Sequence, residues 1–75
     1  MFINVELEAT GERINYNCNE IFSVREVKIT NQDGELVARA EIHFKNGQEV
    51  LVHHQVSTVC NACQTALGVG VVQVS

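Results

Sequence analysis

The sequence predicts a small α+β domain in which antiparallel hairpins are followed by one helix. Three observations predict this class. Polar and apolar residues alternate along most of the first 56 positions, glycine-containing turns interrupt the alternation, and helical spacing replaces it at residues 58–67. We therefore expect an antiparallel β-meander of about five hairpin-linked strands, with one C-terminal helix packed on the sheet and a short final strand. Residues 1–75 are expected to form a single domain.

The first predicted hairpin turns at Thr10-Gly11, because apolar residues alternate with polar ones on both sides of this dipeptide. A two-residue loop there sets Glu8 opposite Arg13, which is a favourable cross-strand pair of opposite charges. The same register places three apolar pairs on one face: Leu7 with Ile14, Val5 with Tyr16, and Ile3 with Cys18.

The segment that follows, residues 19–23, loses the alternation. It is expected to cross from one strand to the next while Ile21 and Phe22 fill the core. In the strand beyond it, Val27 and Ile29 alternate with polar residues and are expected to point inward.

The second hairpin joins strands over residues 24–31 and Leu36–Lys45 at the turn signal Asp33-Gly34. Two loop lengths remain open. A four-residue loop sets Lys28 against Glu41, whereas a two-residue loop sets like charges opposite each other, which is mildly unfavourable.

The third hairpin contains Asn46-Gly47. A two-residue turn there would send Val50 and Val52 to the polar face, so the hydrophobic pattern requires a loop with an odd number of residues. We expect the three-residue loop Lys45-Asn46-Gly47, with Gly47 in the left-handed conformation of a G1 bulge. This loop predicts four pairs: Ile42 with Val50, Ala40 with Val52, Ala38 with His54, and Leu36 with Val56.

A helix is predicted over residues 58–67, with Ser57 as its N-cap and Gly68 just after its end. Its apolar stripe consists of Val59, Cys60, Cys63, Ala66 and Leu67. The apolar tail, residues 69–75, is expected either to complete the sheet as a final strand or to pair with another chain.

The composition argues against several classes of function. The net charge is −4, and the five basic residues are scattered singly, so the basic patch typical of nucleic-acid binding is missing. No apolar stretch is long enough to span a bilayer. The first residues alternate and lack a basic region, so no signal peptide is indicated and a cytoplasmic location is expected.

Cys60-Asn61-Ala62-Cys63 is the one motif with a chemical interpretation. Two thiols three residues apart on a helix can share a Zn²⁺ ion, and Cys18 and His54 lie on the predicted core-facing sides of their strands. A zinc site of Cys18, His54, Cys60 and Cys63 is therefore one hypothesis. The cysteines also suit plain core packing, and a thiol–disulfide role for Cys60 is a third interpretation.

No cofactor motif or catalytic constellation is recognised, and a chain of this size is expected to leave little room for a pocket of about 300 Å³ or more. His43 and His53 are expected on the outer face beside Arg39, Glu41 and Glu49, as ordinary surface residues. The leading hypothesis is a non-enzymatic protein-interaction module that binds a second copy of itself or another protein, and a homo-oligomer is expected. No nucleic-acid, membrane or cofactor partner is expected. A zinc-supported domain is the alternative.

Overall fold

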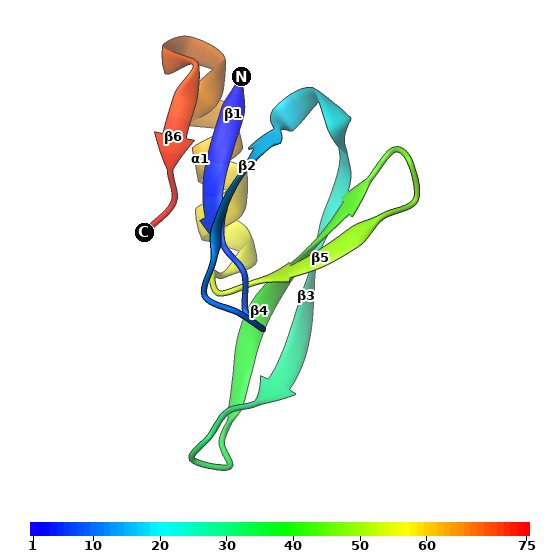
Figure 1. Ribbon diagram of the computed structural model, residues 1–75, viewed down its shortest axis with the longest axis vertical. Coiled ribbons are helices and arrows are strands. Elements are labelled where there is room, and N and C mark those ends of the chain that lie inside the picture. The colour runs from blue at the N-terminus through cyan, green and yellow to red at the C-terminus, as the bar shows by residue number, and fades with distance from the viewer.

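The computed structural model describes residues 1–75 and confirms the α+β class, with a helix after the hairpins and a short last strand (Figure 1). The strands form two three-stranded sheets, in the orders β2-β1-β6 and β3-β4-β5. The elements are β1 (Phe2–Glu6), β2 (Arg13–Asn17), the 3-10 turn η1 (Cys18–Glu20), β3 (Ile21–Thr30), β4 (Leu36–Phe44), β5 (Glu49–Val52), α1 (Val56–Val69) and β6 (Val71–Gln73).

The two sheets are joined along β1, which pairs antiparallel with β2 and parallel with β6. Just beyond β1, Leu7 forms a bridge to Val52 of β5. Around this bridge, the N–H of His53 donates to the carbonyl of Glu6 at 2.8 Å, and the N–H of Glu8 donates to the carbonyl of Leu51 at 3.0 Å. The path of β1 therefore runs from the first sheet into the second.

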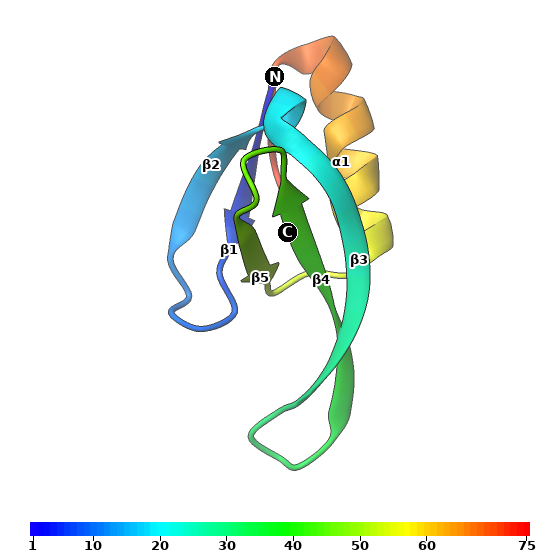
Figure 2. The same cartoon turned by 90° about the vertical axis from the view of Figure 1, so that its right-hand side faces the viewer.

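Helix α1 packs against β1 and β6 of the first sheet and against β3 and β4 of the second (Figure 2). It closes the apolar space between the sheets. The core contains ten buried apolar residues: Ile3, Val5, Ala40, Ile42, Phe44, Val52, Val59, Ala62, Ala66 and Val74. Neither α1 nor η1 has the length and apolar character that a membrane-crossing helix requires.

The predicted register of the first hairpin is wrong by two residues, because Val5 lies opposite Ile14 and Ile3 lies opposite Tyr16. The loop is longer than two residues, since the N–H of Leu7 donates to Glu12 O at 2.8 Å and the N–H of Gly11 donates to Leu7 O at 2.9 Å. A shift of two preserves the faces, so the predicted apolar face still points to the core. The expected Glu8–Arg13 pair does not form.

The second hairpin has a longer loop than either predicted form, since its strands end at Thr30 and Leu36. The side chain of Asn31 accepts hydrogen bonds from the N–H groups of Asp33 and Glu35, both at 2.9 Å, and these bonds fix the loop. Lys28 therefore lies opposite Ala38 rather than opposite Glu41.

This register also corrects the expected orientation of β3. Val27 and Ile29 are half-buried, but they lie opposite Arg39 and Val37 and so share the outer face of the second sheet. Phe22 does not fill the core, because a register irregularity between Ile21 and Ser23 turns it outward and leaves it 76% exposed. Ile21 does pack against the core, as expected.

The third hairpin confirms the three-residue loop. Ile42 pairs with Val50, Ala40 pairs with Val52, and Gly47 has a φ of 89°. The two further pairs, Ala38 with His54 and Leu36 with Val56, do not form because β5 ends at Val52 and the chain turns into the helix.

Helix α1 is longer than predicted at both ends. Gln55 occupies the N-cap position, so Ser57 lies inside the first turn and the expected Ser57 cap is wrong. Gly68 is helical, and Gly70 ends the helix with a φ of 92°. The buried stripe is Val59, Ala62 and Ala66, whereas Leu67 is 67% exposed. Small alanine side chains allow the helix to lie close to the strands.

Candidate functional site

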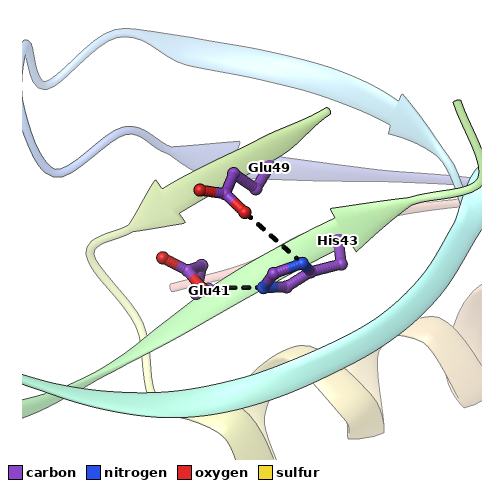
Figure 3. A group of neighbouring side chains, drawn as sticks. All are labelled: Glu41, His43 and Glu49. Carbon is purple, nitrogen blue, oxygen red and sulfur yellow. Dashed lines mark hydrogen bonds and ion pairs between the residues drawn. The ribbon is translucent and has the colours of Figure 1, made fainter. Parts of the chain in front are cut away.

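The outer face of the second sheet carries a cluster of Glu41, His43 and Glu49 (Figure 3). Glu41 and His43 are two residues apart on β4 and share a face, and Glu49 is the register partner of His43 on β5. The imidazole lies between the two carboxylates: Nε2 is 2.7 Å from Oε1 of Glu41, and Nδ1 is 3.6 Å from Oε2 of Glu49. Alternation and the three-residue loop together predict this arrangement, although each residue taken singly suggests only an ordinary surface position.

A second polar group joins the β1–β2 loop to the second sheet. Arg39 Nε donates to Glu8 Oε1 at 2.5 Å, and His53 Nδ1 lies 3.1 Å from Glu8 Oε2. Burial alone would raise the pKa of Glu8, but the hydrogen bonds and positive charges of His53 and Arg39 outweigh it, so this pKa is lowered from 4.5. Glu8 therefore stays ionised at neutral pH.

This group borders a cleft of about 470 Å³, larger than the sequence led us to expect. The lining contains one hydrophobic residue among eight, whereas small-molecule pockets are mostly apolar. Glu8 and Arg39 neutralise each other within it. The lining residues are Glu8, Ile29, Thr30, Asn31, Gln32, Asp33, Arg39 and His53.

His54 lies on the core side, as predicted, and is 7% exposed. Its Nε2 accepts a hydrogen bond from the N–H of Glu6 at 3.0 Å. This contact lies between two pairings of the same chain segment. On one side of it, Asn4 O accepts a hydrogen bond from Val74 N–H next to β6, and on the other side Leu7 forms its bridge to β5. The imidazole thus serves as the acceptor that neither neighbouring strand supplies, which requires a neutral ring with its proton on Nδ1.

The environment of His54 keeps the ring neutral. Burial lowers its pKa from 6.5, and the positive charges of Arg13 and His53 act in the same direction. Glu6 and a main-chain hydrogen bond with Ser75 act in the opposite direction but are smaller effects.

The four residues of the predicted zinc site are not brought together. Glu41, His43 and Glu49 form the one group of three or more His, Cys, Asp or Glu side chains with ligand atoms within 4.8 Å of each other. His54 is engaged with Glu6. All three cysteines are free thiols, and Cys60 is exposed rather than part of the core stripe.

Cys18 and Cys63 do lie close together. Burial raises the pKa of Cys63 to about 12, and the neighbouring Cys18 and Cys60 thiols add to this effect. A thiol with a raised pKa is a poor nucleophile at neutral pH. Cys63 is therefore suited to packing between the helix and the end of β2, where Cys18 begins η1.

The last strand, β6, completes the first sheet and leaves its other edge unpaired (Figure 1). Its inner side is anchored to β1 by hydrogen bonds from Phe2 N–H to Gly70 O and from Val74 N–H to Asn4 O. Because strand groups alternate in direction, the main-chain groups of Val71 and Gln73 point away from β1. They form the open edge of the sheet.

Exposed apolar side chains surround this edge. The end of α1 and the beginnings of β1 and β6 lie at the same end of the molecule in both views (Figures 1 and 2). Val71 and Phe2 are register partners. The exposed fractions are 40% for Phe2, 67% for Leu67, 68% for Val69 and 57% for Val71.

Comparison with protein-family models, with curated proteins and with solved structures finds no match to this chain.

Proposed function

We propose that this protein is a small, non-enzymatic interaction module that self-associates by pairing the β6 strands of two copies. The observation that carries this proposal is that β6 has no charged residue of its own, the nearest cation being the Arg13 guanidinium that donates to Val74 O at 2.6 Å just beyond the strand. Residues 71–75 contain no charged side chain, and the strand is bordered by exposed apolar residues.

The other edges of the sheets are less suited to pairing. The β3 edge is longer, but it carries the exposed charged residues Arg25, Glu26 and Lys28, and charged side chains on an edge oppose strand addition. The β2 edge carries no large exposed apolar residue, and the side chain of Arg13 at its start reaches across β1 to donate to Val74 O at 2.6 Å.

A second copy is the occupant that fits this edge best. Two identical β6 strands related by a two-fold axis pair antiparallel, and each then adds its own apolar residues to the same interface. Each chain carries a net charge of −4, which opposes association over most of the surface and favours contact where the edge is uncharged.

The proposal is tested with Val71→Lys, which places a charge on the open edge. We expect the wild-type protein to dimerise in sedimentation velocity experiments, and the variant to weaken dimerisation by at least about tenfold, because a buried unpaired charge is costly. Leu36→Lys is the matched control, since Leu36 is 71% exposed but lies on the β3–β4 hairpin at the other end of the molecule (Figure 1).

A second variant, Gln73→Pro, removes one outward N–H without adding charge. It should also weaken the dimer. Deletion of residues 69–75 is a poorer test, because Val74 is only 2% exposed and its loss would damage the core. A wild-type protein that remains monomeric up to its solubility limit would overturn the proposal, as would equal effects of Val71→Lys and Leu36→Lys.

A further inference from the structure

The cluster of Glu41, His43 and Glu49 combines three side chains of metal-ligating type on two paired strands. Two of them project from adjacent same-face positions of β4, and the third projects from the paired position of β5 (Figure 3). The side chains of Glu41 and His43 are 25% and 24% exposed, so they are partly held by their surroundings, whereas that of Glu49 is 61% exposed and free to adjust.

The spacing of the donor atoms suits a single small cation. One His43 nitrogen and one oxygen from each glutamate lie within 4.8 Å of one another. Zinc bonds nitrogen and oxygen ligands at about 2.0–2.2 Å in tetrahedral geometry, so two ligands of one ion lie roughly 3.3–3.6 Å apart. Nδ1 of His43 and Oε2 of Glu49 are 3.6 Å apart and already suit one ion, whereas Oε1 of Glu41 lies 2.7 Å from Nε2 and must move to reach the same ion.

The charges in this cluster are not balanced within the chain. The ion pairs of Glu41 and Glu49 are both made with His43. Arg25 lies opposite Glu41 in the strand register but makes no ion pair with it. No Lys or Arg side chain pairs with either carboxylate, and a divalent ion would neutralise both.

The ligand types indicate which cation fits. Mg²⁺ and Ca²⁺ prefer oxygen ligands alone, whereas an imidazole with carboxylates suits Zn²⁺ and related transition metals. From this donor set and its placement we propose that Glu41, His43 and Glu49 bind one Zn²⁺ ion, with solvent completing the coordination. This site goes beyond the proposed self-association and lies on a different element from β6.

A zinc ion in this site would replace the contact between His43 Nε2 and Glu41 Oε1. A metal bonds only to an unprotonated nitrogen, so the imidazole must be neutral in the complex.

The test is isothermal titration of ZnCl₂ into the reduced protein. Because thiols also bind zinc, the titration uses a Cys60→Ser/Cys63→Ser background, which should bind one ion per chain. In this background, His43→Gln and Glu49→Gln should each weaken binding by at least about tenfold, since even outer-shell substitutions cost 10–100-fold at metal sites. Glu49 is exposed, so its replacement leaves the fold intact.

His53→Gln is the matched control, because His53 also contacts a glutamate but belongs to the other polar group. It should leave the zinc affinity unchanged, and MgCl₂ should produce no comparable binding. Three results would overturn the proposal: no zinc binding in the Cys60→Ser/Cys63→Ser background, an unchanged zinc affinity in His43→Gln, or equal losses of affinity in His43→Gln and His53→Gln. Sedimentation velocity with and without a chelator tests the two proposals separately. If dimerisation through β6 does not depend on zinc, the chelator leaves it unchanged.

Discussion

His53 and His54 are neighbours in the sequence but belong to two different regions of the molecule. His54 is buried at the seam where β1 passes from β6 to β5, and it accepts a main-chain hydrogen bond. The side chain of His53 is 48% exposed on the polar outer face, beside Glu8. The seam depends on a neutral imidazole in a fixed tautomer, whereas the outer face depends on charge. Two histidine side chains thus contribute to the fold in different ways, His54 through a main-chain hydrogen bond and His53 through its contact with Glu8.

Replacing His54 and His53 with alanine, one at a time, gives the strongest test of this difference between the two histidines. His54→Ala leaves the N–H of Glu6 without its acceptor and opens a cavity, so we expect the free energy of unfolding to fall by about 2–4 kcal/mol. His53→Ala removes a partly solvated contact and should cost no more than about 0.5 kcal/mol. Urea denaturation of both variants measures the difference. Equal losses would show that the seam hydrogen bond is not important for stability.

The pH dependence of stability tests the neutral state of His54. Its pKa is lowered from 6.5 in the folded protein, so the unfolded chain binds more protons than the folded chain as the pH falls below that value. The stabilisation is therefore complete above about pH 6.5 and is lost progressively below it. Denaturation of the wild-type protein from about pH 8 to about pH 5 should show this decline.

His54→Gln provides the control for this decline. A glutamine oxygen can accept the Glu6 N–H but does not titrate. His43 and His53 are present in both proteins, so their contributions cancel when the two profiles are compared. A variant profile that falls as steeply as the wild-type profile would assign the decline to another group.

The sequence predicts a hairpin well where its own loop determines the register. The loop Lys45-Asn46-Gly47 leaves one register that buries Val50 and Val52, and that register is observed. It also places Glu49 opposite His43, so the cluster on the outer face can be deduced from the same pattern. The inward side of His54 follows from the same alternation.

The first hairpin shows where sequence patterns are insufficient. Its loop closes through hydrogen bonds from Leu7 N–H to Glu12 O and from Gly11 N–H to Leu7 O, and so is longer than the predicted two residues. Local alternation does not fix this loop length, because registers that differ by two residues bury the same face. The residues of the predicted zinc site are not brought together, because helix orientation is also not determined by local spacing. Helical spacing places Cys60 near Cys63, but the helix turns its two alanines towards the sheet and leaves Cys60 exposed.

Glu8 tests the same comparison from the side of the outer face, and its expected effect is well below that of His54→Ala. Its pKa is lowered in the folded protein, so its stabilisation is present above the ordinary carboxyl value of 4.5 and is lost as the pH falls through the folded-state value. The side chain is 21% exposed, and solvent screens its pairs with Arg39 and His53, so Glu8→Gln should cost about 1 kcal/mol or less at neutral pH.

Two features distinguish this loss from a packing defect. It should shrink as salt is added, because screening weakens partly exposed ion pairs, and it should vanish at acidic pH, where the glutamate is itself protonated. Glu12→Gln is the matched control, since Glu12 is exposed in the same loop and makes no ion pair. A Glu8→Gln loss that is insensitive to salt and pH would mean that the outer face, like the seam at His54, is held by packing and hydrogen-bond geometry rather than by charge.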